Sequence, residues 1–315
     1  MSHGAFRLTR PPKRIGRWMS IILASLSCKR LSLSQVGYCK FALMKIATFN
    51  INNINRRLAN LLAWLGEAEP DIVCLQELKV PDGTFPSEAI HSAGYEAVWR
   101  GQPTYNGVAI LSKRGTPIVT RRDLPGDTND VQNRYIETAV GGVLVACLYL
   151  PNGNPQPGPK FDYKQAWFDR LIAHARQLFA EGVPVILAGD FNVVPTDLDI
   201  YPTKSYADNA LLQPESRARF ACLMKQGWTD AIRTLHPDRP IYTFWDYDRK
   251  RWERNAGLRI DHLLLSTDLR SRLVDAGVDK WVRGEDGASD HAPAWLVLSD
   301  RPTRSFPSRS RKGKR

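Results

Sequence analysis

The sequence predicts a single α/β domain in which layered sheets pack against helices. Between residues 44 and 298, short apolar runs of strand length alternate with segments of helical periodicity. This alternation is typical of α/β proteins, because their helices cover the faces of sheets. No internal stretch is long and polar enough to act as a linker, and no fixed-period repeat stands out.

Each predicted strand is an apolar run bounded by turn residues, and each predicted helix has an apolar face and a Pro or Gly just beyond its end. The predicted strands are residues 45–51, 71–77, 107–112, 142–150, 183–192, 259–266 and 292–299. The predicted helices are residues 56–68, 163–180 and 214–226.

The net charge of +12 is concentrated at the two ends of the chain. Residues 1–43 carry eight Lys or Arg and no acidic residue, and residues 299–315 carry seven Lys or Arg and one Asp, so residues 44–298 are left at −2. We therefore expect a basic extension over 1–43, disordered or not native, a globular core over 44–298 and a disordered basic tail over 299–315. Any basic groove in the core must be local.

The cysteine pattern and the short apolar stretch near the N-terminus indicate the cellular compartment of the protein. The five cysteines show no CxxC spacing, which argues against a structural zinc site and fits a reducing compartment. The run "SIILASLS" is too short to span a membrane, and basic residues follow it at once. We expect a cytoplasmic, nucleoid-associated protein with no membrane partner, and no export.

The stretch "VILAGDFNVVPTDLD" ends a buried strand with a carboxylate and an amide. Asp190 and Asn192 are two residues apart, so strand alternation points them to the same side. The ordinary explanation is a capped strand end. The C-terminal end of such a strand is also where α/β folds place their sites.

Polar residues flank five other predicted strands. Each has an ordinary explanation on its own, such as a solvated strand end or a turn. Together they are harder to dismiss, because carboxylates beside apolar strands are costly unless paired or bound to metal. They are Asn50 and Asn52, Glu77, Tyr149, Asp261, and the pair Asp290 and His291.

These residue types suit one chemistry. Carboxylate and amide oxygens are hard ligands that favour Mg²⁺, with Mn²⁺ as a substitute, over zinc. Hydrolysis of a phosphodiester needs a base for water, donors for the phosphate and a stabiliser for the leaving oxygen. Asp190, the Asn, His and Tyr donors and the metal ion can fill these roles.

The motifs "TFNIN", "LQE", "GVAIL", "YLPNG", "GDFNVVPTDLD", "RIDH" and "SDHAP", in this order, resemble the exonuclease III family of abasic-site endonucleases. That family belongs to the endonuclease/exonuclease/phosphatase superfamily, and the resemblance runs from Met44 to about Leu298. It implies a four-layered α/β sandwich, two mixed sheets packed face to face between helices. It also implies Mg²⁺-dependent cleavage of DNA 5′ to abasic sites and removal of 3′ nucleotides or 3′ blocking groups.

The resemblance implies a metal site. Glu77 is the expected carboxylate ligand, Asn50 orients metal or phosphate, and Asp290 lies near the metal. Asn52 stands where relatives have Asp, which puts a metal site built partly from that position in doubt. The full expected set is Glu77, Asn50, Asp190, Asn192, Asp290 and His291.

The resemblance also implies the catalytic roles. Asp190 activates or positions the attacking water, and Asn192 hydrogen-bonds the phosphate. Tyr149 contacts the phosphate or aids the leaving group. His291 donates to a phosphate oxygen and is oriented by Asp261.

Aromatic and basic side chains interleave in residues 243–259. Aromatic rings can wedge into a base stack while Arg and Lys hold phosphates. The alternative for any one of these rings is a place in the core. The residues expected to contact DNA are Phe244, Trp245, Arg249 and Arg254 in this loop, and Arg134 in "VQNRYIE".

The preferred function is a monomeric nuclease acting on double-stranded DNA with abasic sites or damaged 3′ ends, in base excision repair. One alternative is a superfamily phosphatase or phosphodiesterase acting on a phosphoester that is not nucleic acid. The stretch "NVVPTDLD", "RIDH" and the aromatic-basic loop favour the nuclease. A second alternative is a catalytically inactive nucleic-acid-binding scaffold. Competent residues at every expected catalytic position argue against it.

Overall fold

A computed structural model describes residues 43–302. The predictions for residues 1–42 and 303–315, which cover nearly all of the extension and most of the tail, lie outside the described residues. Strand β1 begins at Leu43 and strand β12 ends at Ser299, so each extends one residue beyond the predicted core. These two end residues pair with each other in register.

Twelve strands form two mixed six-stranded sheets among the described residues. In the first sheet the strand order is β11 (Leu273–Val278), β12 (Ala294–Ser299), β1 (Leu43–Asn50), β2 (Ile72–Gln76), β4 (Val108–Ser112) and β3 (Glu96–Arg100). In the second sheet it is β5 (Ile118–Arg121), β6 (Tyr135–Val140), β7 (Val143–Tyr149), β8 (Val185–Asp190), β10 (Asp261–Leu265) and β9 (Thr229–Asp230).

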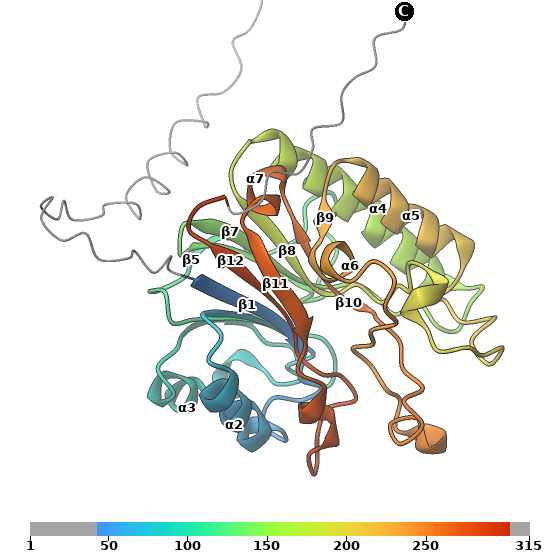
Figure 1. The fold of residues 1–315 in the computed structure, drawn as a ribbon, viewed down its shortest axis with the longest axis horizontal. Coiled ribbons are helices and arrows are strands. Elements are labelled where there is room, and N and C mark those ends of the chain that lie inside the picture. The colour runs from blue at the N-terminus through green and yellow to red at the C-terminus, as the bar shows by residue number, and fades with distance from the viewer. Residues whose placement is uncertain (1–42, 303–315) are drawn as a thin grey trace, which may run out of the picture.

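Helices cover the outer faces of both sheets, so the fold has four layers (Figure 1). Helices α2 (Leu58–Ala68) and α3 (Ser87–Ser92) lie on the first sheet, and α4 (Pro159–Ala180) and α5 (Pro214–Lys225) on the second. The shorter helices are α6 (Ala231–Leu235), α7 (Thr267–Arg270), η1 (Asp82–Thr84), η2 (Asp197–Asp199), η3 (Asp248–Lys250) and η4 (Lys280–Gly284).

The central core lies between the two sheets. Side chains such as Ile46 and Ile110 from the first sheet pack against Val145 and Ile186 from the second. Two further apolar clusters lie under the helices, one between α2 and the first sheet and one between α4 and the second. The predicted four-layered sandwich is confirmed.

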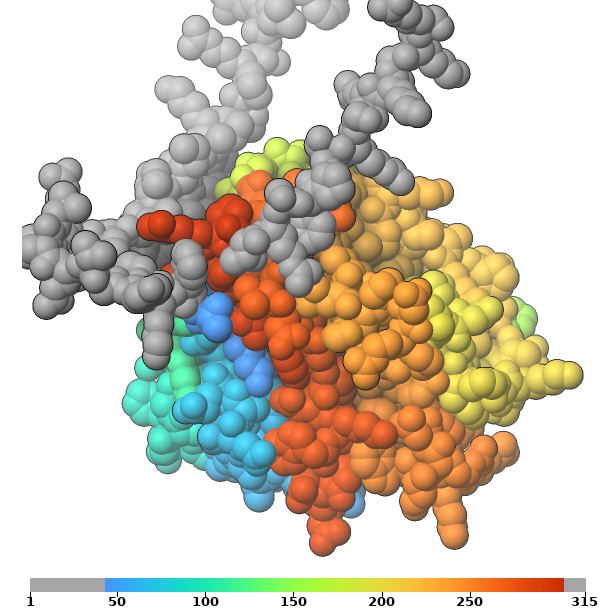
Figure 2. Space-filling view, in the orientation of Figure 1, coloured from blue at the N-terminus to red at the C-terminus, as the bar shows by residue number. Residues whose placement is uncertain are grey.

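The strand directions bring the predicted polar residues to one edge. Strands β1 and β2 are parallel, as are β7 and β8, so their C-terminal ends lie together. Strands β12 and β10 run antiparallel to β1 and β8, so their N-terminal ends join the same edge. Figure 2 shows the red C-terminal segment of the chain beside the blue first strand, as this pairing requires.

All seven predicted strands and all three predicted helices are present within a few residues of the expected bounds. Strands β3, β5, β6, β9 and β11 were not predicted. Strand β6 carries a buried glutamate, Glu137, whose side chain is satisfied by Thr120, Tyr135 and His174. Strands β3 and β5 are partly exposed edge strands without a clear alternation.

Within residues 43–302, none of the helices combines the length and the apolar composition that a membrane span needs.

Substitution by alanine is predicted to have opposite effects on stability at two glycines. A Cβ at Gly189 would lie 1.9 Å from the carbonyl oxygen of Leu148 in the adjacent strand, so Gly189→Ala must push two core strands apart. We expect it to lower the free energy of unfolding by about 1–3 kcal/mol or more. Gly66 in α2 has open space around it, and Gly66→Ala should instead raise stability by about 0.5–1 kcal/mol.

Urea unfolding followed by circular dichroism measures both effects. A Gly189→Ala protein as stable as the wild type would contradict this account of the packing between β7 and β8.

Candidate active site

The residues predicted from the strand ends lie together at the edge where the two sheets meet. A chain of short hydrogen bonds joins the first sheet to the second. Asn50 at the end of β1 donates from Nδ2 to Glu77 Oε1 at 2.8 Å and to Asp190 Oδ2 at 3.0 Å. The residues brought together are Asn50, Asn52, Glu77, Tyr149, Asp190, Asn192, Asp261, Asp290 and His291.

Asp190 ends β8 with its carboxylate buried and hydrogen-bonded. The backbone N–H of Asn192 donates to Oδ1 at 2.8 Å, and Asn192 Nδ2 lies 3.3 Å from Oδ2. Asn192 has a positive φ of 46°, which an asparagine tolerates better than most residues. Burial, followed by the nearby negative charge of Asp261, raises the pKa of Asp190 to about 7.

Asp261 and His291 form a buried carboxylate–imidazole pair. Nδ1 of His291 lies 2.9 Å from Asp261 Oδ2, and Nε2 faces Asp190 Oδ2 at 3.9 Å. Burial alone would lower the pKa of His291, but Asp261, followed by Asp190 and Asp290, outweighs it and raises that pKa to about 10. The ring of Phe244 packs edge-on against the imidazole, with 4.9 Å between ring centres. The imidazole is therefore held in orientation, with Nε2 turned toward Asp190.

Glu77 lies where β2 ends, between a donor from β1 and a cation. Its Oε2 pairs with Lys79 Nζ at 2.7 Å. Burial would raise the pKa of Glu77, but Lys79 and the Asn50 hydrogen bond outweigh it and lower the pKa. The lowered pKa keeps the carboxylate ionised, and 16% of the side-chain surface is exposed, so solvent can reach it.

Asn52 and Asp290 lie next to this carboxylate. Asn52 Nδ2 donates to Asp290 Oδ1 at 2.9 Å, and Asn52 Oδ1 accepts from Lys79 Nζ at 2.7 Å. The backbone N–H of Asn52 donates to Asn50 Oδ1, which fixes the amide orientation of Asn50. The asparagines of "TFNIN" thus act as connectors between the charged groups.

Tyr149 and Arg134 form one wall of a cleft that opens beside Glu77. The guanidinium of Arg134 stacks on the Tyr149 ring, with its carbon 4.7 Å from the ring centre. Burial, then the charges of Glu77 and Asp190, raise the pKa of Tyr149, so its phenol stays protonated. The cleft has a volume of about 750 Å³, and its lining includes the cations Lys79, Arg134 and Lys160.

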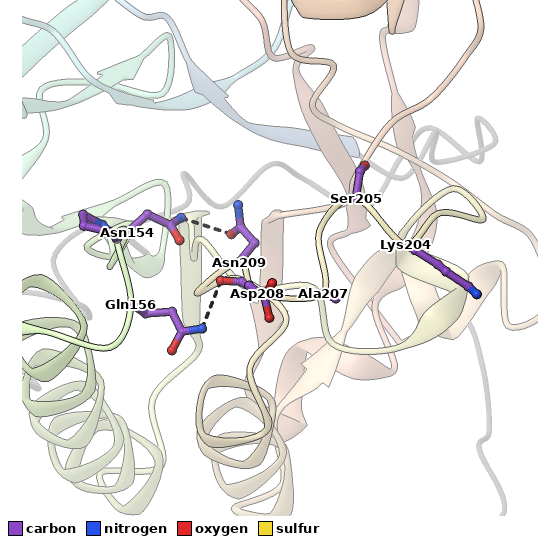
Figure 3. Close-up of a pocket in the computed structure, with 8 residues that line it drawn as sticks. Asn154, Gln156, Lys204, Ser205, Ala207, Asp208 and Asn209 are labelled. Carbon is purple, nitrogen blue, oxygen red and sulfur yellow. Dashed lines mark hydrogen bonds between the residues drawn. The ribbon is translucent and has the colours of Figure 1, made fainter.

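A second hollow of about 550 Å³ lies between two loops beside the site (Figure 3). Asn154 donates to Asn209 Oδ1 at 3.1 Å, and Gln156 donates to the carbonyl of Asp208 at 3.0 Å, so the loops are tied together. Asn152 then links them to the site, because its Nδ2 donates to Asn192 Oδ1 at 3.0 Å.

Three residues that join this site were missed in the sequence. Lys79 follows the predicted ligand Glu77 by two positions, and Asn152 lies in the quoted "YLPNG". Lys164 is fully buried in α4, and its Nζ donates to the carbonyls of Pro151 and Asn192. Burial lowers the pKa of Lys164 to about 7. Only the tertiary contacts reveal Lys164, since its sequence neighbours are those of an ordinary amphipathic helix.

The predicted DNA-contacting residues differ in exposure, and Arg134 lines the cleft described above. Trp245 is 1% exposed and packs against Trp252, so it belongs to the core and not to the surface. Phe244 is half-buried against His291, whereas Arg249 and Arg254 are exposed on the loop.

The carboxylates of the site differ in how well they could hold a divalent ion. Ligand atoms of Asp190, Asp261 and His291 lie within 4.8 Å of one another, so this group could hold a metal. Asp261 is fully buried, however, and one of its oxygens is taken by His291. Glu77 and Asp290 are both partly exposed, so a hydrated cation can reach their carboxylates, and the surrounding oxygens suit a hard ion such as Mg²⁺. The residues therefore fit such an ion at Glu77.

A buried ion-pair network supports the start of β10. Arg259 Nε donates to Asp199 Oδ1 and its Nη1 donates to Asp230 Oδ2, both at 2.7 Å. Asp199, the last aspartate of the "VVPTDLD" stretch, is fully buried, and Arg259 is 1% exposed. The network anchors the chain two residues before Asp261.

Comparison with known proteins identifies relatives along most of the chain. Residues 47–291 match the Endonuclease/Exonuclease/phosphatase family. The exodeoxyribonuclease III of Haemophilus influenzae is 36% identical over 264 residues, covering 80% of this chain and 98% of that protein.

Two solved structures are similar in fold. An AP endonuclease from Archaeoglobus fulgidus has a TM-score of 0.77 and 33% identity, and the match covers 82% of this chain and all of that one. A variant of the 3′ phosphatase NExo from Neisseria, bound to a product DNA hairpin, has a TM-score of 0.78 and 37% identity. That match covers 81% of this chain and 99% of the other.

Removing the arginine of the buried network should strongly destabilise the fold. Arg259→Met leaves Asp199 and Asp230 without their common cation, and we expect a loss of about 3–5 kcal/mol of unfolding free energy. The control is Arg219→Met, because Arg219 pairs with Asp169 at the surface, where a pair contributes about 0–1 kcal/mol. Denaturant unfolding of both variants measures the difference, and equal losses would contradict it.

Proposed function

The chain belongs to the Endonuclease/Exonuclease/phosphatase family, and we propose that it is a Mg²⁺-dependent DNA repair nuclease of the exodeoxyribonuclease III type. It hydrolyses phosphodiesters 5′ to abasic sites and removes 3′ nucleotides or 3′ blocking groups, the steps that base excision repair requires. It acts as a monomer on double-stranded DNA with abasic sites or damaged 3′ ends.

The strongest support is the buried group of Asp190, Asp261 and His291 beside the reachable carboxylate of Glu77. Asp190 provides a proton acceptor, His291 an oriented proton donor and Glu77 a metal ligand, all in one site. Phosphodiester hydrolysis by water needs these three functions.

Glu77 would hold Mg²⁺, with Asn50 and Asp290 beside it. The bound ion would supply Lewis-acid neutralisation of the developing phosphate charge.

Asp190 orients the attacking water and takes its proton. Its Oδ1 is held by the Asn192 backbone, and Asn50 holds Oδ2, so the carboxylate is fixed in one orientation. A carboxylate fixed in this way acts as a general base without further reorganisation.

His291 and Tyr149 stabilise the phosphate. Asp261 holds Nδ1 of His291, which leaves the Nε2 proton free to be donated to a phosphate oxygen. Tyr149, protonated and next to Glu77, donates to the phosphate or to the leaving oxygen. Donors positioned before the reaction stabilise the charge of the transition state at no cost of rearrangement.

The cleft beside the site suits a polyanion. Lys79, Arg134 and Lys160 line it, although residues 44–298 as a whole carry a charge of −2. A local concentration of cations binds a phosphate backbone and makes affinity depend on salt. The relatives described as exodeoxyribonuclease III, AP endonuclease and 3′ phosphatase agree with DNA as the polyanion.

The decisive experiment is incision of a labelled duplex with one abasic site, in Mg²⁺ and in EDTA. We expect cleavage 5′ to the site in Mg²⁺ only, together with release of phosphate from a 3′-phosphorylated duplex. An inositol phosphate and sphingomyelin are assayed in parallel. Turnover of either one without DNA cleavage would favour a superfamily phosphodiesterase of another specificity.

Asp190→Asn should nearly abolish incision, because the amide cannot accept the proton of water. DNA binding should persist or tighten, since a negative charge near the scissile phosphate is removed. The matched control is Asp197→Asn in the same stretch, whose side chain is 92% exposed and which should retain activity. Single-turnover incision and DNA affinity are measured for both. Cleavage by Asp190→Asn at near the wild-type rate would refute this mechanism.

His291→Ala should lower single-turnover incision on the order of 10²-fold or more, the scale for losing a preorganised donor. His91→Ala is the control, because the His91 side chain is 73% exposed on α3 and should not affect the rate. Thermal unfolding shows whether each variant is folded. A folded His291→Ala protein with undiminished activity would remove His291 from the mechanism.

A further inference from the structure

Lys164 is a buried cation that the proposed mechanism does not use. It lies in the second turn of α4, and its Nζ donates to the carbonyl of Pro151 at 3.0 Å and to that of Asn192 at 2.6 Å. Pro151 belongs to the loop after β7, and Asn192 to the turn after β8. An ammonium has three donors, so one side chain can bind both segments at once. Burial of this charge is costly unless its donors are bound, so the ammonium depends on these carbonyls as much as they depend on it.

The bond to Asn192 supports the backbone conformation that holds Asp190. The φ of Asn192 is 46°, in the left-handed region that residues other than glycine rarely adopt. In this conformation its backbone N–H donates to Asp190 Oδ1 at 2.8 Å, and its Nδ2 donates to the carbonyl of Leu150 at 2.9 Å. The Lys164 ammonium binds the carbonyl of the same residue, on the other side of the Cα atom. The orientation of the proposed general base therefore depends in part on this ammonium.

The same side chain fixes the loop after β7. Asn152, the residue after Pro151, donates from Nδ2 to Asn192 Oδ1 at 3.0 Å, so this loop holds the Asn192 amide directly. Gly153 has a φ of 88° and packs on the stem of Lys164, because a Cβ at this position would lie 2.5 Å from the Lys164 Cδ. The ammonium and its stem thus set the height of the loop above α4.

We propose that Lys164 is a positioning residue of the active site, which joins the loop after β7 to the turn after β8 and so holds Asn192 and Asp190 in their catalytic geometry. This inference rests on the nuclease function proposed above. Lys164 is fully buried, so it acts through Asn192 and not on the DNA itself. A displacement of about 1 Å at the reacting groups can cost on the order of 10²-fold in rate. The rate of the chemical step should therefore depend on Lys164 more than the affinity for DNA does.

Lys164→Met removes the ammonium and keeps an apolar stem under Gly153. We expect it to slow single-turnover incision about 10- to 10²-fold and to change the affinity for abasic DNA by less than about threefold. Lys164→Gln is a second variant, whose amide nitrogen is one bond closer to the backbone, and its rate should fall in the same direction. The control is Leu178→Ala, which removes core packing about 21 Å further along α4. It should lower stability without slowing incision.

Two measurements on the full chain test the role of Lys164. Hydrogen–deuterium exchange without DNA should become faster over residues 150–154 and 190–194 in Lys164→Met, and not in Leu178→Ala. In a double-mutant cycle, Asn152→Ala combined with Lys164→Met should slow incision by less than the product of the two single effects, because both side chains act on Asn192. Urea unfolding shows that each variant is folded and how much stability it has lost.

The outcomes separate this inference from the proposed function. Faster exchange confined to the two segments, with slower incision and retained affinity, supports it. Unchanged exchange in Lys164→Met, additive effects in the cycle, or an equal loss of rate in Leu178→Ala would overturn it. If the wild type cuts abasic DNA and Lys164→Met cuts it equally fast, the proposed function stands and the inference fails. If the wild type does not cut abasic DNA, the proposed function fails, and the exchange measurement alone decides whether Lys164 holds the two segments.

Discussion

The burial of two carboxylates face to face is the constraint on which the rest of the site depends. Asp190 and Asp261 are opposite each other in the register of β8 and β10, and both are buried. Two negative charges buried on neighbouring strands repel each other, and burying them costs several kcal/mol of folding free energy unless they are compensated. Amide donors from Asn50 and Asn192 and the imidazole of His291 provide the compensation. The stability of the fold therefore requires these neighbours, in addition to the catalytic roles proposed for them.

The fold supplies these neighbours through strand direction. Two parallel pairs end at one edge of the sandwich, and two antiparallel strands begin there, so residues distant in sequence lie within hydrogen-bonding distance. Asn50 and Asp190 are 140 residues apart and still bonded at 3.0 Å. The positive charges are also concentrated at the site by the fold. Lys79 and Arg134 line the cleft, although the core as a whole is slightly negative.

Strands with a continuous apolar run between turn residues could be predicted from the sequence, because their signal is local. Strand β6 could not, since Glu137 interrupts its apolar pattern. The partner that makes this glutamate tolerable, His174, lies 37 residues away on α4. The partly exposed edge strands β3 and β5 gave no clear alternation either. The β-propensity of a sequence describes one segment at a time, whereas the stability of such strands depends on the strands and side chains they pair with.

For the site, the sequence by itself determined which polar residues flank the strands and what chemistry their types allow. The α/β architecture accounts for a site at the C-terminal strand ends, and the family resemblance implied that the residues before β10 and β12 join it. The tertiary structure decided the rest: that Trp245 is buried, that Lys79 pairs with Glu77, and that Lys164 is buried beneath the loop of Asn192. The physical reason is that burial and charge pairing depend on segments brought together only by folding, so no local pattern encodes them.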